Sequence, residues 1–246
     1  HTTSKLDPVK FFNEPSDKTI LLETPWKRDA KYFEKVYISS LALMKMTIHA
    51  KSGKNIEVMG MMTGKIFDRS IVILDAYPLP VEGTETRVNA QAEGYEYMVQ
   101  YLDSLKEVGR SENIVGWYHS HPGYGCWLSG IDVATQSLNQ NFQDPYLAVV
   151  IDPTKTQLQG KVEIGAFRTY PDNFIREKNM KDSKSENTRD LPKEKRLDFG
   201  AHCEDYYMLD IEIFNSPNDS EILEVLNKKS WMHGLLSHVD NDRKIA

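Results

Sequence analysis

Residues 114–132 read Ile114-Val-Gly-Trp-Tyr-His-Ser-His-Pro-Gly-Tyr-Gly-Cys-Trp-Leu-Ser-Gly-Ile-Asp132. The first five residues are apolar and rich in strand formers, which predicts a strand that runs into His119. The Pro-Gly pair behind the second histidine ends such a strand. Ser129, followed three residues later by Asp132, is typical of a helix start and predicts a helix over about residues 129–141 with Ser129 as its N-cap. The stretch therefore predicts a strand, a turn and a helix that meet at one place.

This arrangement would gather two imidazoles and one carboxylate. Alternate residues of a strand share a face, so His119 and His121 would point the same way and Ser120 the other way. The first turn of the helix would bring Asp132 opposite the two rings. Three protein ligands of these kinds leave one coordination position open, as in catalytic rather than structural zinc sites. We therefore predict one Zn²⁺ per chain, bound by His119, His121 and Asp132.

Each part of this pattern also has a simpler explanation. A carboxylate at the third helical position can merely cap the helix, and two histidines at a strand end can be ordinary surface residues. The histidine pair, the Pro-Gly turn, Ser129 and Asp132 occur together, and this combination favours the metal site.

Two residues are candidates for catalysis at such a zinc. A zinc ion with an open position lowers the pKa of its bound water to about 7. A nearby carboxylate that is not a ligand can accept the proton of that water, and Glu57, at the start of a predicted buried strand, is our candidate. Ser129 is the candidate for holding the developing oxyanion. The role of helix cap is an equally strong interpretation of Ser129, and the two roles are compatible.

The overall composition limits the class of protein. The 246 residues, 40% of them hydrophobic, suffice for one large or two small domains with a real core. A net charge of −6 argues against nucleic-acid binding. The sequence has no apolar run long enough for a membrane span, and its first residues lack the pattern of a signal peptide. Two cysteines, Cys126 and Cys203, do not make a disulfide framework, which favours a reduced intracellular compartment.

Hydrophobic patterns predict one α/β or α+β mixed domain with insertions. Strands are expected at 35–39, 57–64, 71–77, 114–118, 146–151, 161–168 and 206–214, and helices at 40–50, 89–108, 129–141 and 220–236. The expected organisation is an extended N-terminal arm (1–30), a core (31–170, with a first insertion at about 78–112), a charged flexible insertion (171–197), and a C-terminal strand and helix (198–246).

Glu57, His119-x-His121, Ser129 and Asp132 together match the signature of the JAMM (MPN-plus) metalloproteases, which the chain resembles. The surrounding sequence is similar to the COP signalosome branch of this family over roughly residues 30–170. The stretches that carry the similarity are Glu57-Val-Met-Gly60, residues 79–91, residues 116–132 and Val150-Ile-Asp-Pro-Thr154. The similarity is thinner over 198–240, and the arm and the charged insertion diverge.

This resemblance implies a zinc isopeptidase that removes the ubiquitin-like modifier Nedd from cullin lysines as the catalytic subunit of the signalosome. It implies that His119, His121 and Asp132 bind zinc, that Glu57 is the general acid and base, and that Ser129 supports the tetrahedral intermediate. The implied fold is a curved mixed sheet flanked by helices. The implied partners are other signalosome subunits, including a motif-less MPN subunit, and neddylated cullins, with no nucleic acid and no membrane, in the cytoplasm and the nucleus.

Glu85 and Arg87, just before the predicted 89–108 helix, suggest a regulatory loop. If the loop lies across the zinc, Glu85 could replace the water as a ligand, and Arg87 could pair with Asp132 or with an acidic part of the substrate tail. An ordinary surface loop is the alternative.

Three other functions stay open. Gly125-Cys126-Trp127 resembles the nucleophile of papain-like proteases, but His202 has no supporting context as its partner. A ubiquitin-specific JAMM enzyme would use the same catalytic residues. A scaffold MPN domain would keep the fold without the activity, although such domains usually lack part of the ligand set.

Overall fold

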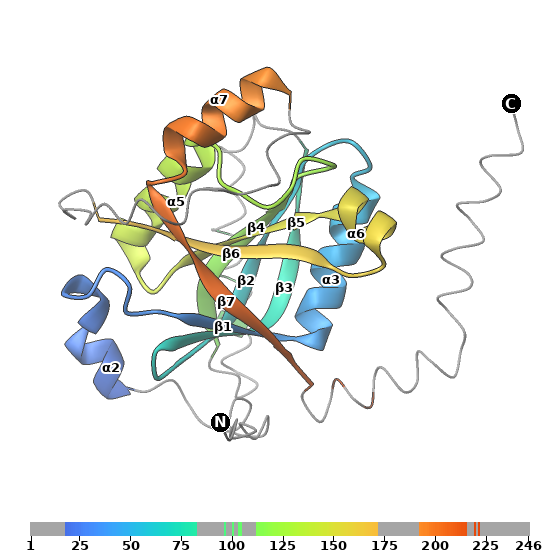
Figure 1. Cartoon of the computed structure of the whole chain (residues 1–246). Coiled ribbons are helices and arrows are strands. Elements are labelled where there is room, and N and C mark those ends of the chain that lie inside the picture. Colours follow the sequence, from blue (N-terminus) through green and yellow to red (C-terminus); the bar gives the residue numbers. More distant parts are fainter. Residues whose placement is uncertain are drawn as a thin grey trace, which may run out of the picture.

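The computed structural model describes residues 18–82, 96, 100, 103–104, 112–171, 192–215, 219 and 221. Seven strands of these residues form one sheet that closes into a barrel in the order β1-β3-β2-β4-β5-β6-β7 (Figure 1). The sheet is mixed, because β1 runs parallel to β3 and to β7, and β4 runs parallel to β5. The strands are β1 Lys35–Ser39, β2 Val58–Phe67, β3 Ser70–Glu82, β4 Asn113–Ser120, β5 Leu147–Asp152, β6 Glu163–Thr169 and β7 Tyr206–Phe214. The predicted mixed class is confirmed, and the sheet curves as far as closure.

The helices of the described residues lie around this barrel. They are α2 Lys18–Glu23, α3 Ser40–Ser52, α5 Gly130–Gln143, α6 Pro153–Gln159 and α7 Lys193–His202, with a 3-10 turn η1 at Pro25–Lys27. Figure 1 shows α5 and α7 together on one side of the sheet, and α3 with α6 on another. Within the described part of the chain, no helix has the length and apolar character needed to span a bilayer.

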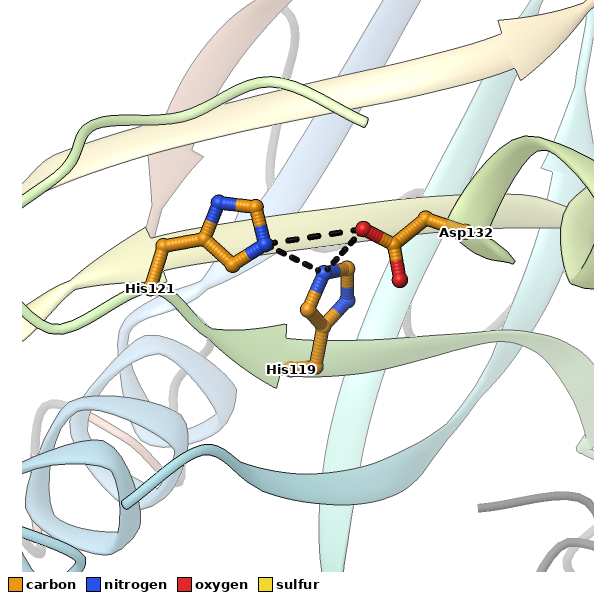
Figure 2. A group of neighbouring side chains, drawn as sticks. All are labelled: His119, His121 and Asp132. Atoms are coloured by element: carbon orange, nitrogen blue, oxygen red, sulfur yellow. Dashed lines mark hydrogen bonds and ion pairs between the residues drawn. The ribbon is translucent and has the colours of Figure 1, made fainter. Parts of the chain in front are cut away.

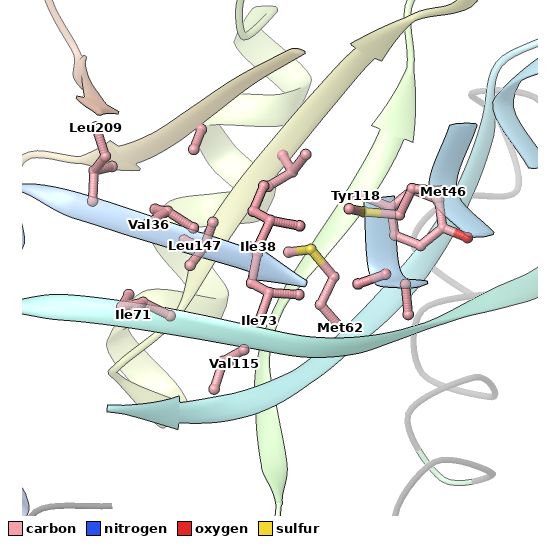
Figure 3. Close-up of a cluster of buried hydrophobic side chains, with 14 of the residues drawn as sticks. Val36, Ile38, Met46, Met62, Ile71, Ile73, Val115, Tyr118, Leu147 and Leu209 are labelled. Carbon is pink, nitrogen blue, oxygen red and sulfur yellow. The ribbon is translucent and has the colours of Figure 1, made fainter. Parts of the chain in front are cut away.

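The main hydrophobic core takes side chains from all seven strands and from α3 (Figure 3). Val36 and Ile38 of β1 pair with Ile71 and Ile73 of β3 in the parallel register, and all four side chains are fully buried. Met46 of α3 packs into the same cluster. Burying one such side chain stabilises the fold by about 1.5–3 kcal/mol. Because many such side chains hold the strands together, the closed sheet supports the residues at its strand ends.

A second core covers the other face of the sheet next to α5. Trp117 of β4, Val150 of β5 and Leu128 in the loop before α5 are buried there. The pairing of β4 with β2 shifts register at Val115, so the simple alternation of faces fails at that residue. After this bulge the alternation resumes and places His119 on the same face as Trp117. The candidate site therefore lies on the α5 side of the sheet.

Some local predictions are wrong. Residues 18–23 form a helix rather than part of an extended arm, and Trp26 behind them is buried and stacks on Phe33 with ring centroids 5.4 Å apart. A six-residue helix is too short to show a hydrophobic period, which explains the error. The helix predicted at 40–50 is confirmed as α3, and Ser39 caps it by accepting a hydrogen bond from the backbone N–H of Ala42. Helix α6 was not predicted from the sequence.

The charged segment predicted to be flexible over residues 171–197 ends in an ordered helix, because α7 begins at Lys193. This helix is held by contacts with the loop and helix start next to it. The ring of Phe199 packs edge-on against Trp127 at 5.8 Å between centroids, and Asp198 Oδ1 accepts a hydrogen bond of 3.1 Å from the backbone N–H of Gly130. Such tertiary partners cannot be inferred from a charged composition.

Several predicted features lie outside the described residues. These are the arm before residue 18, the first insertion beyond the end of β3, and the helices predicted at 89–108 and 220–236 apart from single positions. Glu85 and Arg87 also lie outside them.

Candidate metal centre

The three predicted zinc ligands converge at the end of β4 (Figure 2). His119 belongs to β4, His121 follows it, and Asp132 lies in the first turn of α5. The two Nε2 atoms are 3.0 Å apart, and Asp132 Oδ2 lies 3.3 Å from His119 Nε2 and 3.5 Å from His121 Nε2. The three side chains are almost fully buried, with exposed fractions of 0%, 2% and 1%. The cluster could hold a metal ion.

The size and chemistry of this triangle fit zinc. A tetrahedral zinc with bonds of about 2.0–2.1 Å has donor atoms roughly 3.3–3.4 Å apart. The observed separations of 3.0, 3.3 and 3.5 Å surround that value. A buried carboxylate without a counter-charge costs several kcal/mol, and a divalent cation between the three donors would supply that charge.

The loop behind the second histidine fixes the orientation of the His121 ring. The carbonyl oxygen of Gly125 lies 3.0 Å from His121 Nδ1. A carbonyl can only accept, so Nδ1 carries the proton and Nε2 keeps its lone pair for the cluster. The buried Asp152 carboxylate holds the loop by accepting hydrogen bonds from the backbone N–H groups of Gly123 at 2.9 Å and Gly125 at 2.8 Å. Both glycines have φ above +80°, where a β-carbon would be strained.

A chain of buried contacts fixes His119 relative to Asp132. The Trp117 ring stacks on the His119 ring at 4.6 Å and 11°. Trp117 Nε1 donates a 2.9 Å hydrogen bond to the side-chain oxygen of Gln136, which lies one helical turn after Asp132 on α5. The amide of Gln136 donates in turn to the carbonyl oxygen of Tyr146 at 3.0 Å. Helix α5 is thereby tied to β4, which sets the distance between ligands from two different elements.

Ser129 and Asp132 form the predicted helix start. Ser129 Oγ accepts a 3.2 Å hydrogen bond from the backbone N–H of Asp132, and Asp132 Oδ2 accepts a 2.9 Å hydrogen bond from the backbone N–H of Ser129. The Ser129 hydroxyl donates to the same Oδ2 at 2.6 Å. The role of Ser129 as helix cap is confirmed. Its role at an oxyanion stays a prediction, because here the hydroxyl is directed at Asp132.

Glu57 lies directly before β2, next to the histidine strand. Met59 pairs with His119 in the antiparallel register, so Glu57 lies level with His121 and on the same face. The hydroxyl of Tyr124 donates a hydrogen bond to Glu57 Oε1, and the Tyr124 ring stacks on the His121 ring at 4.5 Å and 30°. The carboxylate is therefore linked to the cluster through one tyrosine. Its role as proton acceptor stays a prediction.

Cys126 does not have the properties of a nucleophile. Burial raises the pKa of the Cys126 thiol far above its ordinary value, and the nearby carboxylates of Glu163 and Asp152 raise it further. Nucleophilic cysteines need a lowered pKa. His202, the histidine considered as its partner, instead contacts a carboxylate, because its Nδ1 atom lies 2.9 Å from Asp205 Oδ2. The cysteine-protease interpretation is wrong.

Four supporting residues were not predicted from the sequence, namely Trp117, Tyr124, Gln136 and Asp152. Two of them had a local signal. Gln136 follows Asp132 by four residues, which places both on one face of α5. Asp152 precedes a proline at a helix start, where its side chain accepts hydrogen bonds from the N–H groups of Thr154 and Lys155, both at 2.9 Å. Tyr124 and Trp117 had no such signal.

Comparison with known proteins gives close relatives. A family model described as JAB1/Mov34/MPN/PAD-1 ubiquitin protease matches residues 31–145. COP9 signalosome complex subunit 5 of Debaryomyces hansenii is 66% identical over 234 residues, which are 95% of this chain and 50% of that protein. Subunit 5a of Arabidopsis thaliana is 54% identical over 236 residues, 96% of this chain and 65% of that protein. Subunit 5 of Drosophila melanogaster is 50% identical over 234 residues, 95% of this chain and 70% of that protein. The chain thus spans about half the length of the first of these relatives.

Proposed function

Because the chain belongs to the JAB/MPN family and, within it, to the COP9 signalosome subunit 5 proteins, we propose that it is the catalytic part of a zinc isopeptidase that removes the ubiquitin-like modifier Nedd from cullins. The observation that carries this proposal is the buried triangle of His119, His121 and Asp132. Hydrolysis of an isopeptide bond needs a polarised carbonyl, a deprotonated water and a proton for the leaving amine.

His119 Nε2, His121 Nε2 and Asp132 Oδ2 would hold the zinc. When bound, zinc supplies a Lewis acid that polarises the carbonyl oxygen and lowers the pKa of a bound water to about 7. The chain's own groups prepare this site, because the Gly125 carbonyl selects the His121 tautomer and Gln136 fixes α5 against β4.

Glu57 is the proposed general base and then general acid. Its carboxylate would take a proton from the attacking water and give it to the lysine nitrogen as the carbon–nitrogen bond breaks, so that the amine leaves neutral. The position of Glu57 level with His121 supports this role. Ser129 is proposed to support the tetrahedral intermediate, which requires its hydroxyl to turn from Asp132 toward the substrate.

We also propose that the chain works with other signalosome subunits, including an MPN subunit without the ligand set, on neddylated cullins in the cytoplasm and the nucleus. Exposed apolar side chains on one face of α5 offer such a partner a contact, at Ile131, Leu138 and Phe142. Phe142→Glu should then weaken co-purification with that subunit and leave the zinc content unchanged.

Two alternatives concern the same site. The matched family model is described as a ubiquitin protease, so ubiquitin is the alternative modifier. Conjugates of one cullin with Nedd and with ubiquitin, cleaved side by side, separate the two. A scaffold domain is the other alternative, and the complete ligand triangle argues against it.

The decisive experiment measures cleavage of a neddylated cullin by the full-length protein that contains this chain, alone and assembled with signalosome subunits. Glu57→Gln removes the proton acceptor at nearly constant volume, and we expect cleavage to fall about 100- to 10,000-fold with unchanged zinc content. Glu212→Gln is the matched control, because this glutamate is exposed and its partner is Lys35 at 3.2 Å. Equal rates for Glu57→Gln and wild type, or no cleavage by the zinc-loaded assembly, would reject the proposal.

The proposed regulation of the site concerns Glu85 and Arg87. We propose that Glu85 competes for the open zinc position and that Arg87 pairs with Asp132 or with an acidic substrate tail. Glu85→Ala should raise the cleavage rate of the isolated chain, and an unchanged rate would reject this latch.

A further inference from the structure

We propose that Tyr124 is a positioning residue that holds Glu57 in place for proton transfer, an inference that rests on the proposed isopeptidase function. The Tyr124 hydroxyl donates a hydrogen bond to Glu57 Oε1. A glutamate side chain rotates about three bonds, so a carboxylate that must meet a proton at one place needs a fixed rotamer. A donor on Oε1 fixes that rotamer.

Tyr124 is itself held by contacts with two residues of its own loop and one residue of α7. Its ring stacks on the His121 ring at 4.5 Å. Its carbonyl oxygen accepts a 2.8 Å hydrogen bond from Trp127 Nε1. The ammonium group of Lys195 on α7 lies 3.5 Å from the centre of the Tyr124 ring, which is a close cation–π contact. The phenol group is thus placed before it reaches Glu57, as a positioning group must be.

The ring and the hydroxyl of Tyr124 have separable tasks. The ring packs on a proposed zinc ligand, and the hydroxyl bonds to the proposed base. Tyr124→Phe keeps the ring contacts and removes only the donor. Tyr124→Leu removes the ring as well, so it should also weaken zinc binding, whereas Tyr124→Phe should not.

The test uses the full-length protein assembled with signalosome subunits and a neddylated cullin. For Tyr124→Phe we expect kcat to fall about tenfold, with KM unchanged within about twofold, because the hydroxyl acts on the base and not on substrate binding. Zinc content and melting temperature should match wild type. Tyr77→Phe is the matched control, since it also removes a tyrosine hydroxyl that donates to a carboxylate, Asp75 Oδ2 at 3.1 Å, and it should leave kcat unchanged.

A second measurement does not depend on turnover. Crystal structures of the zinc-loaded wild type and Tyr124→Phe should show Glu57 in one rotamer in the wild type and displaced or in several rotamers in the variant, with the three ligands unmoved. Lys195→Met should have a smaller effect, about a two- to threefold loss of kcat, because the ring keeps its contact with His121.

The outcomes separate this inference from the proposed function. If wild type cleaves and Tyr124→Phe cleaves equally fast with Glu57 in the same rotamer, the inference is wrong and the isopeptidase function stands. A fall in zinc content or melting temperature that accounts for the lost activity of Tyr124→Phe would make Tyr124 merely structural and would also overturn the inference. If the zinc-loaded wild-type assembly cleaves nothing, the function fails, and the rotamer of Glu57 alone decides whether Tyr124 holds it.

Discussion

The two ends of α5 carry polar clusters of opposite character. At the N-terminal end, Asp132 Oδ2 lies within 3.5 Å of two histidine Nε2 atoms. At the C-terminal end, Asp144 caps the helix and receives two hydrogen bonds from Arg168, from Nη1 at 2.7 Å and from Nη2 at 2.9 Å. Both clusters join the helix to the sheet and both contain an aspartate, yet only the second contains a permanent cation.

This difference separates a structural cluster from a functional one. The guanidinium of Arg168 neutralises Asp144 and also donates to the carbonyl oxygen of Tyr146 at 2.6 Å. The histidine cluster instead directs two imidazole nitrogens and one carboxylate oxygen at a common point, and it contains no group with a permanent positive charge. A buried cluster with its own counter-charge stabilises the fold, whereas one that collects donors without it favours a bound cation.

The largest expected effect comes from removing a donor of the histidine cluster. In His119→Ala we expect zinc to fall from about one per chain to near zero, with loss of cleavage. Zinc at a thousandfold excess over its Kd stabilises the wild type by about 4 kcal/mol, so a chelator should lower the melting temperature of the wild type and not of the variant. Metal analysis and thermal unfolding measure both. One zinc per chain in His119→Ala would contradict the ligand assignment.

Breaking the arginine cluster should affect stability and not zinc. Arg168→Met leaves the partly buried Asp144, whose side chain is 18% exposed, without its counter-charge, and we expect the free energy of unfolding to fall by about 3 kcal/mol. Lys35→Met breaks the exposed pair with Glu212 and serves as the control, with an expected loss of about 0–1 kcal/mol. Denaturant titration compares the two variants, and metal analysis should give unchanged zinc content in both. A loss of zinc from folded Arg168→Met would contradict the assignment of the arginine cluster to stability alone.

A smaller effect is expected from the link between the clusters. Gln136→Met removes the contact that joins Trp117 to the carbonyl of Tyr146 and keeps a similar volume. We expect zinc affinity to fall about 10- to 100-fold, and unfolding free energy to fall by about 1–3 kcal/mol. Competition with a chromophoric chelator measures the affinity. Unchanged affinity would mean that α5 holds Asp132 without this link.

The smallest expected effect concerns Cys126. Burial raises its pKa, so the thiol stays protonated at neutral pH, while iodoacetamide reacts with the thiolate. Peptide mapping of the native chain should therefore find Cys203 labelled before Cys126, with unchanged zinc content and cleavage. Fast labelling of Cys126 together with loss of cleavage would revive the cysteine-protease interpretation.

Of the two clusters, only the histidine cluster could be predicted from the sequence. Its geometry follows from short spacings, because two residues along a strand share a face and Ser129 with Asp132 spans one helix start. Arg168 and Asp144 lie 24 positions apart and belong to no local pattern. The hydrogen bond between Tyr124 and Glu57 spans 67 positions, so only the folded sheet shows it.

The seven strands could also be predicted, because the run of apolar residues that marks a buried strand lies within the strand itself. The closure of the sheet could not be, because the parallel pairing of β1 with β7 depends on the register of segments from opposite ends of the fold. Helix α7 likewise could not be predicted, because it is held by contacts with Trp127 and Gly130. Its own charged sequence does not indicate these contacts.

The closing strand has a consequence for biosynthesis. β7 pairs with both β1 and β6, and it leaves the ribosome after Asp132 and every other strand of the barrel. Until it emerges, a nascent chain has two open strand edges, and such edges invite pairing with other chains. All three donors leave the ribosome before β7, yet the Tyr206 hydroxyl of β7 accepts a hydrogen bond from the backbone N–H of Leu128 beside the site, so the same strand closes the barrel and completes the support of the donors.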